Sequence, residues 1–340
     1  MDRRAFFQLV DMLRDELQPA ADTFVEPLPP EIKVAVAVYK YASCGEYRTI
    51  GKGFGVSKST VCHCVHTVAQ AIIKKMSRQY LSWPSPEECA EIARKIQGKF
   101  GLPNALGAID GTHIPVTAPR EGAADFANRK QYASIVMQAV VDHNMLFRDV
   151  TAQHPGSNHD AAVLRDSYLF NHFNRLFPES DRELDGIVDG NGDALPFVVP
   201  FYIVGDPAYP LLTWLLKNYP HEESPEEVSF NLRMNKLRII VEQAFGRLKG
   251  RWRILCKKSD QFVFYMPRVI VACAVLHNYV EMKNQPYNPV WDRERLEAER
   301  EFPQPDPIFQ QRGHDEDANL LRDHISAYLA RNYPLLTRED

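Results

Sequence analysis

The chain has 340 residues, of which 45% are hydrophobic and 25% charged, and its formal net charge is −4. This composition is that of an ordinary globular protein, and the longest apolar runs, 198–204 and 269–276, are too short to span a bilayer. The N-terminus shows no secretory signal, and six cysteines without a CxxC pair give no sign of a disulfide framework. We therefore expect an intracellular protein with no membrane partner.

The charge is unevenly distributed along the chain. A net charge of −4 argues by itself against nucleic-acid binding, but residues 47–86 contain six Lys or Arg and no acid. Residues 233–258 contain nine Lys or Arg and a single acid, Glu242, whereas acids gather in 179–193 and after residue 290. This separation predicts two basic surfaces and favours a nucleic-acid partner.

Residues 1–82 are predicted to form a helical N-terminal region. Within it, 46–75 has the pattern of a helix-turn-helix, with a short helix ending near Phe54, a glycine turn, and Ser57 as the N-cap of a second helix. A plain helical hairpin is the alternative. The exposed residues of this segment that we expect to contact DNA are Arg48, Lys58, Ser59, Thr60 and His63.

Two local patterns resemble metal sites but lack the geometry or the ligands that such sites need. In "CHCVH" (62–66) the cysteines and histidines point in different directions on a helix, so packed cysteines and surface histidines are favoured over zinc. The segment "DGNGDALPFVVP" begins like a calcium loop, but Ala194 and Pro200 stand where glycine and glutamate are needed. We interpret 179–196 as a flexible acidic loop.

Residues 83–282 are predicted to form a mixed α/β core. A linking helix near residue 86 is followed by three apolar, β-branched runs that are typical of strands, within 106–118, 132–142 and 146–156. A helix beginning at Asp160 as its N-cap, a strand over 197–206, a helix over 211–219 and two long helices, 233–252 and 266–282, follow. Residues 283–340 are predicted to be a polar tail with a short amphipathic helix.

Three carboxylates stand at positions where they could share one site. Asp110 ends the apolar half of the first strand, Asp206 ends the fourth, and Glu242 is the single acid of the basic helix. Ligands collect at strand ends in α/β sheets, and carboxylates that converge need cations to hold them ionised. Mg²⁺ or Mn²⁺ suits oxygen ligands, and two such ions could support phosphodiester hydrolysis.

Each acid could also have a purely structural role. Asp110 and Asp206 could each begin a turn, and Glu242 could be an ion-pair partner of Arg238. The basic helix supports the site because its cations can bind phosphate. Those that we expect to contact DNA are Arg238, Arg247, Lys249 and Arg251, and Gly246 would let another chain approach closely.

The ordered motifs resemble those of the PIF/Harbinger transposase family and its domesticated Harbinger-transposase-derived nucleases. The segments that carry the resemblance, from about residue 100 to 281, are "GAIDGTHIPV", "NRKQYASIVMQAVVD", "HPGSNHDAAVL", "VGDPAYPLLTWL", "VEQAFGRLKGRWRIL" and "VACAVLHNYV". The resemblance implies an RNase H-like fold and a metal-dependent DDE triad, which falls on Asp110, Asp206 and Glu242. It also implies that Asp160 is an additional metal ligand, with the helix N-cap as the alternative.

The resemblance further implies a divalent-metal-dependent DNA endonuclease of the transposase type. Double-stranded DNA is the expected substrate, and a Myb-like DNA-binding protein or a second copy of the chain are expected partners. The expected location is the nucleus, with the cytoplasm as a second location where import depends on a partner. The alternative function is a domesticated, non-cleaving DNA-binding or scaffold protein that retains the fold.

Overall fold

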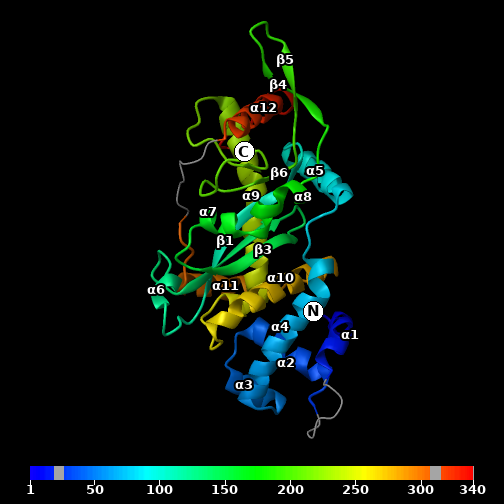
Figure 1. Cartoon of the computed structure of the whole chain (residues 1–340), viewed down its shortest axis with the longest axis vertical. Helices are drawn as coiled ribbons and strands as arrows, with labels where there is room; N and C mark the ends of the chain where they lie inside the picture. The colour runs from blue at the N-terminus through cyan, green and yellow to red at the C-terminus, as the bar shows by residue number, and fades with distance from the viewer. Residues whose placement is uncertain (19–26, 307–314, 340) are drawn as a thin grey trace.

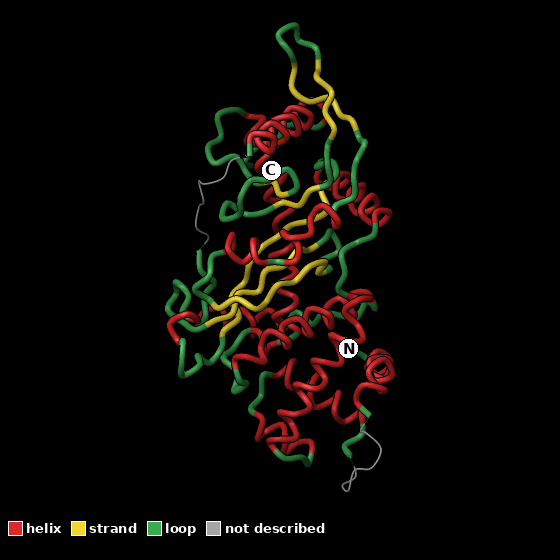
Figure 2. The backbone as a smooth tube through the Cα atoms, in the orientation of Figure 1, coloured by secondary structure: helices red, strands yellow, loops and turns green. Residues whose placement is uncertain are grey.

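The computed structural model of the protein describes residues 1–18, 27–306 and 315–339. The molecule is elongated, with a helical end, a central sheet and a protruding hairpin at the opposite end (Figures 1 and 2). The helical end begins the chain and contains α1 (Arg3–Leu17), α2 (Pro30–Ser43), α3 (Tyr47–Phe54) and α4 (Lys58–Tyr80), after which α5 (Pro86–Phe100) leads to the sheet.

The junction between α3 and α4 is set by local chemistry. Gly55 ends α3 with a φ of +69°, a conformation that favours glycine, and the Ser57 side chain caps α4 by accepting the N–H of Thr60. A Cβ on Gly51 would lie 2.6 Å from the carbonyl oxygen of Val56, so the turn requires a glycine there. Two helices joined by a glycine turn are therefore present, as both the helix-turn-helix and the plain helical hairpin predict, and the helix-turn-helix assignment stays a prediction.

The central sheet contains five strands in the order β3-β2-β1-β6-β7. β1 pairs antiparallel with β2, which pairs antiparallel with β3, whereas β6 is parallel to β1 and β7 is parallel to β6. The strands are β1 (Ala105–Pro115), β2 (Ser134–Val141), β3 (Phe147–Pro155), β6 (Tyr202–Val204) and β7 (Leu215–Leu216). The prediction of a mixed α/β core is confirmed.

Two predictions between residues 179 and 219 are wrong. The expected flexible acidic loop forms a two-stranded hairpin, β4 (Glu183–Val188) and β5 (Ala194–Val198), because the Asp189 carboxylate accepts backbone N–H bonds that close its turn. The expected helix over 211–219 is instead the short strand β7, whose Leu215 pairs with Ile203 of β6. Its apolar run is buried at the sheet edge, where tertiary pairing overrides helical periodicity.

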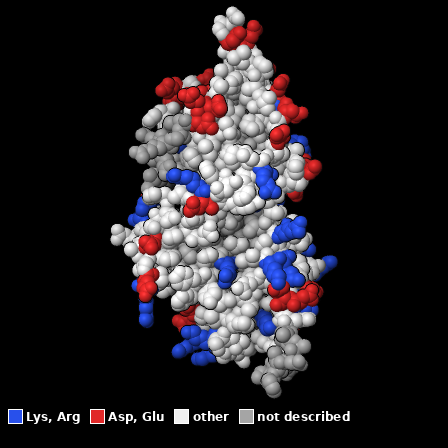
Figure 3. Space-filling view, viewed as in Figure 1, with Lys and Arg blue, Asp and Glu red and all other residues white. Residues whose placement is uncertain are grey.

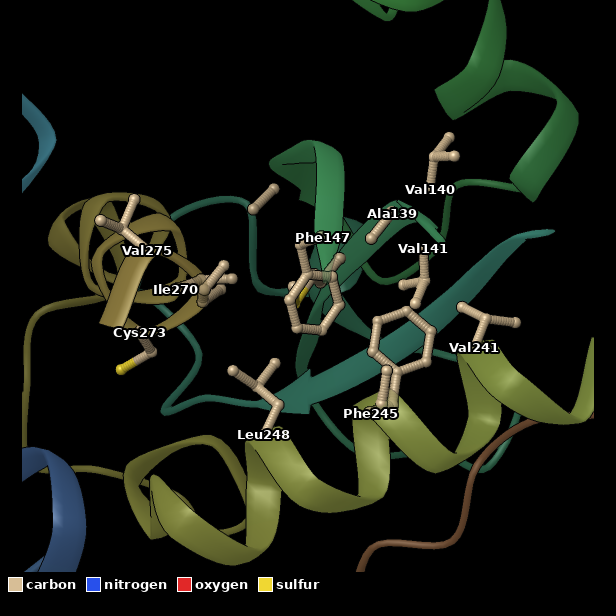
Figure 4. Packing of buried hydrophobic residues seen from close by; sticks show 14 of the residues in the cluster. Ala139, Val140, Val141, Phe147, Val241, Phe245, Leu248, Ile270, Cys273 and Val275 are labelled. Atoms are coloured by element: carbon tan, nitrogen blue, oxygen red, sulfur yellow. The ribbon is translucent and has the colours of Figure 1, made fainter. Parts of the chain in front are cut away.

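Helices α9 (Pro225–Arg251) and α10 (Met266–Met282) pack on the sheet and form much of its core. Figure 4 shows Phe147 of β3 between the two helices, with its ring centroid 5.9 Å from that of Phe245. α10 also packs against α4, so the helical end and the sheet share one hydrophobic core. The predicted boundary at residue 82 falls between α4 and α5 and stays a prediction.

One stretch of the described residues, Val263–Met282, is long and apolar enough to cross a membrane by composition alone. It includes α10, and most of it is buried in this core. Core helices of globular proteins meet the same criteria, so this is weak evidence for a membrane span.

The C-terminal segment (residues 283–340) is more ordered than the predicted polar tail. It contains α11 (Val290–Glu301) along α9 and α12 (Glu316–Asn332) beneath the hairpin, while 307–314 lie outside the described residues. Gly246 and Gly250 of α9 face this segment, because an added Cβ would lie 3.7 Å from the Arg295 guanidinium and would overlap the Tyr287 hydroxyl. The distance of 3.7 Å at Gly246 is ordinary van der Waals contact, so the expected close approach is found at Gly250 instead, to Tyr287 just before α11.

Five small elements complete the description of the described residues. They are α6 (Ala123–Phe126), α7 (Asp160–Asp166), α8 (Tyr168–Leu176) and two 3₁₀ turns at Arg253–Leu255 and Val263–Tyr265.

Candidate active site

The register of two neighbouring parallel strands brings Asp110 and Asp206 together. Ala108 of β1 pairs with Val204 of β6, and each aspartate lies two residues further along its strand or just beyond it. Side chains two residues apart along a strand point to the same face of a sheet. The two carboxylates therefore lie next to each other, at the same distance beyond the paired residues of the two strands. Asp110 accepts the N–H of Gly111 at 2.8 Å, and Asp206 accepts that of Ala208 at 3.0 Å. Asp206 therefore begins a turn, as the structural alternative expected, whereas that alternative is wrong for Asp110, which lies inside β1 and pairs with Ala139 of β2.

Asp160 reaches the same place from the start of α7. A Cβ on Gly111 would lie 2.5 Å from an oxygen of the Asp160 carboxylate, so this carboxylate packs on the strand beside Asp110. The N-cap of α7 is His159, and Asp160 is the first helical residue, with no side-chain capping bond. The alternative that Asp160 is a helix N-cap is wrong.

Glu242 approaches from α9, on the opposite side of the cleft. Its side chain is 57% exposed, and its carboxylate lies 3.8 Å from the Arg238 guanidinium one turn earlier. The ion-pair alternative is therefore present in the structure. An exposed pair at this distance is weak, so Arg238 does little to hold the Glu242 side chain in place.

The four acids line one cleft of about 380 Å³ (Asp110, Asp160, Asp206 and Glu242). Three cations, Arg129, Arg238 and Arg295, line it as well, and Lys249 lies at its floor. Acids that could hold metal ions and cations that could hold phosphate thus occupy one concave surface.

Burial and mutual repulsion disfavour ionisation of the aspartates. Burial and the nearby Asp206 carboxylate raise the pKa of Asp110 to about 7, against the opposing effect of Arg238. Burial and Asp206 likewise raise the pKa of Asp160 to about 6, and burial raises the pKa of Asp206. Tyr209 is fully buried, and its hydroxyl donates to the Gln138 side-chain oxygen at 3.2 Å rather than to the carboxylates.

These groups fit a divalent cation in their chemistry. Three buried carboxylates with raised pKa values form an oxygen-rich site that lacks a full complement of positive charge, which a cation would provide. Among the described residues, no three His, Cys, Asp or Glu side chains are grouped closely enough to hold a metal ion together. Binding would therefore require the side chains to close inward.

The structure separates the predicted DNA contacts of α9. Arg238 faces the cleft, but Arg247 and Arg251 bind the Glu281 carboxylate of α10, at 2.7 and 3.3 Å. Lys249 is 3% exposed and donates to the Thr112 hydroxyl at 2.6 Å. The prediction that Arg247, Lys249 and Arg251 contact DNA does not fit these positions, because the basic helix is packed in the core and uses these cations internally.

The predicted helix-turn-helix contacts lie on the surface at the other end of the molecule. Lys58, Ser59 and His63 at the start of α4 are exposed, as is Arg48 on α3, and Thr60 is partly buried by its contact with Ser57. On the face shown in Figure 3, acids gather around the hairpin and α12, and most Lys and Arg lie over the other half. This distribution agrees with the charge separation in the sequence.

Sequence reasoning missed several residues of the cleft. Arg129 lies in the motif "NRKQY", which could have identified it. Arg295, Glu299 and Gln304 come from the C-terminal segment, and no sequence pattern connected them to the site.

Comparison with known proteins identifies the family. Residues 109–278, half of the chain, match the model of the DDE superfamily endonuclease family. Antagonist of like heterochromatin protein 1 from Arabidopsis thaliana is 34% identical over 262 residues, which cover 74% of this chain and 63% of that protein. An ALP1-like protein of the same plant is 31% identical over 350 residues, 97% of this chain and 79% of its own length.

A more distant relative is Homo sapiens HARBI1, whose name describes a nuclease. It is 27% identical over 282 residues, which cover 81% of this chain and 74% of HARBI1. No solved structure matches the chain. The family match spans Asp110, Asp160, Asp206 and Glu242, whereas a fifth acid of the cleft, Glu299, lies beyond it. The chain belongs to the DDE superfamily endonuclease family, and the relatives it is similar to include the ALP1-like protein and HARBI1.

Proposed function

We propose that this chain is a divalent-metal-dependent DNA endonuclease of the DDE type. The observation that carries the proposal is the convergence of four acids from β1, β6, α7 and α9 in a cleft that cations also line. The order of the strands and their directions support an RNase H-like assignment for the sheet. Asp110, Asp206 and Glu242 form the proposed catalytic triad.

Asp110, Asp160, Asp206 and Glu242 would hold the cation, Mg²⁺ or Mn²⁺, with two ions as the full complement. When bound, the ions would supply an activated water and stabilise the leaving oxygen of a phosphodiester. The protein supplies the rest of the site. Arg238 and Arg129 would bind phosphate oxygens beside the scissile bond, and burial excludes bulk water from the aspartates.

The first test of this proposal is Mn²⁺ binding, measured by calorimetry at neutral pH without DNA. We expect wild-type protein to bind Mn²⁺ and Asp206→Asn to bind it far more weakly, with the exposed Asp181→Asn as the matched control. Asp206 couples electrostatically to both Asp110 and Asp160, since its charge raises the pKa of each. Equal binding by wild type and Asp206→Asn would exclude Asp206 from the metal site.

The second test is cleavage of plasmid DNA with Mg²⁺ or Mn²⁺. Asp206→Asn should abolish cleavage and leave DNA binding largely intact, because Asp206 is remote from the exposed cations of α3 and α4. Unchanged cleavage by this variant would remove Asp206 from the mechanism.

We also propose that α3 and α4 bind double-stranded DNA as a helix-turn-helix. The exposed N-terminus of α4 presents its backbone dipole with Lys58, and Arg48 lies on the helix before it. Replacing both by alanine should lower the slope of log affinity against log salt by about 1–2. The same replacement of Arg94 and Lys99 on α5 is the control, and an unaltered slope in the Arg48/Lys58 variant would refute this assignment.

A non-cleaving DNA-binding or scaffold protein is the second candidate function. Two observations favour it: Glu242 points to solvent beside Arg238, and no group of described residues is preformed to hold a metal ion. One relative is named as an antagonist of like heterochromatin protein 1, which describes opposition to another protein rather than cleavage. DNA binding without Mn²⁺ binding or cleavage would support this candidate.

The proposed substrate sets the remaining expectations. A DNA endonuclease acts in the nucleus, and paired DNA ends favour a homodimer or a Myb-like DNA-binding partner. Fractionation of cells and the mass of the DNA-bound complex test these two expectations.

A further inference from the structure

The chain after α11 crosses the mouth of the cleft and contacts the strand that carries Asp110. We call residues 302–306 the crossing segment. In Figure 1 this part of the chain, coloured orange, runs along one side of the sheet before the undescribed stretch. Gln304 and Pro305 line the cleft itself. The segment lies beyond residue 278, where the match to the family model ends.

Gln304 fills a gap in the hydrogen bonding of β1. Beyond Ala108, where its pairing with β6 ends, β1 keeps β2 as its partner on one side only. On the open side, the Gln304 side-chain oxygen accepts the backbone N–H of His113 at 2.7 Å and the hydroxyl of Thr112 at 2.9 Å. Its amide nitrogen donates to the His113 carbonyl at 3.2 Å. One side chain thus replaces a missing neighbouring strand.

The same point of β1 is held from below by Lys249. Its ammonium donates to the Thr112 hydroxyl at 2.6 Å, and that hydroxyl directs its own proton towards Gln304. Lys249 is almost fully buried, so it has no freedom to follow a strand that moves. Lys249, Thr112 and Gln304 therefore fix the chain two residues after Asp110.

The crossing segment is itself anchored at both ends. Phe302 is buried against Tyr132, whose hydroxyl donates to the Pro303 carbonyl at 3.1 Å. Beyond Gln304, Asp306 accepts from Lys130 at 2.8 Å. The Asp306 carboxylate is 86% exposed, so this last ion pair is weak and the buried anchor does most of the holding.

We propose that Gln304 is a positioning residue for the proposed nuclease site. It holds β1 at Thr112 and His113 so that Asp110 stays aligned with Asp206 and Asp160, and this inference rests on the proposed function. Glutamine suits the task because its amide both accepts and donates and adds no charge beside three carboxylates.

The test compares Gln304→Ala and Gln304→Met with wild type in Mn²⁺ calorimetry and DNA cleavage. Outer contacts that orient metal ligands typically contribute a factor of 10–100, so we expect at least about a tenfold loss of Mn²⁺ affinity and of kcat. The affinity for DNA should change less than about twofold, because Gln304 carries no charge that phosphate would bind. Gln304→Met keeps the length of the side chain but cannot form the same hydrogen bonds. Equal losses of Mn²⁺ affinity and kcat in both variants therefore assign the effect to hydrogen bonding.

The controls separate this inference from the proposed function. Gln153→Ala alters an exposed glutamine on β3 and should behave as wild type, and thermal unfolding verifies that each variant is folded. If wild type binds Mn²⁺ and the Gln304 variants bind it equally well, the inference is overturned while the proposed function stands. If wild type neither binds Mn²⁺ nor cleaves, the proposed function fails first. Faster cleavage in Gln304→Ala or in Asp306→Asn would also overturn the inference, since the crossing segment would then obstruct DNA.

Discussion

Replacing Asp110 by asparagine should stabilise the metal-free protein at neutral and alkaline pH, although it removes a proposed catalytic acid. Burial and the Asp206 carboxylate raise the pKa of Asp110 from 3.8 to about 7 in the folded protein. In the unfolded chain the same group ionises near its ordinary value. The folded state thus holds a proton that the unfolded state has released, and free energy of unfolding is lost as the pH rises from about 4 to about 7.

The size of the effect follows from the shift. A difference of about 3 pKa units corresponds to ~4 kcal/mol above pH 7, and local relaxation and water entry make this an upper limit. Asp160, whose pKa is raised to about 6, also lowers the free energy of unfolding as the pH rises. This second loss is complete at a lower pH than that of Asp110. Asparagine keeps an oxygen that can accept the N–H of Gly111 and carries no charge to bury. The variant should therefore gain stability at pH 8 and gain little at pH 4.

Urea unfolding with a chelator present, at pH 4 and pH 8, measures this difference. The matched control is Asp181→Asn, which alters an exposed aspartate outside the cleft. Adding Mn²⁺ should narrow this difference at pH 8, because a ligand that binds only the folded wild type stabilises it by about 2.7 kcal/mol at a hundred times its Kd and by about 4.1 kcal/mol at a thousand times its Kd. An Asp110→Asn variant that is no more stable than wild type at pH 8 without metal would refute the argument from burial and repulsion.

Three further changes test the scaffold of the site. Glu281→Gln leaves the buried Arg251 without its counter-charge and should lower the free energy of unfolding in urea by about 2–4 kcal/mol. A loss below 0.5 kcal/mol, roughly that of a surface change, would contradict the ion-pair assignment. Gly250→Ala forces a methyl group against the Tyr287 hydroxyl and should cost about 1–3 kcal/mol; a neutral result in thermal unfolding would show that α11 tolerates displacement. Ser57→Ala removes the cap of α4 and should cost about 1 kcal/mol in the same assay, and no loss would mean that water replaces the cap.

The local chemistry of the chain was sufficient to predict many individual elements. Ser57 and the glycine before it placed the α3–α4 turn, because capping and positive φ depend on residues adjacent in sequence. The first three strands followed from runs of β-branched residues. The helix predicted over 211–219 is wrong because "LLTWLL" lacks a decisive period, and its pairing with β6 decides its form.

The cleft was predicted in part. Asp110 and Asp206 could be identified because apolar runs end on them, and Glu242 because it is alone among cations. The fate of those cations could not be predicted. An arginine of α9 binds Glu281 if it lies on the face that packs against α10, and is free to bind phosphate only on another face. Because α9 is buried on most sides, its hydrophobic pattern does not show which face packs against α10.

The sequence by itself determined the class of fold, the acids of the site and the family resemblance, because strand periodicity, capping residues and ordered motifs are properties of short stretches of chain. Only the tertiary structure decided which groups surround those acids. Gln304 and Asp110 are separated by almost two hundred residues, and Arg295 lines the cleft from α11, which packs along α9. Such contacts depend on how distant segments pack together to bury apolar surface, and no local pattern encodes that arrangement.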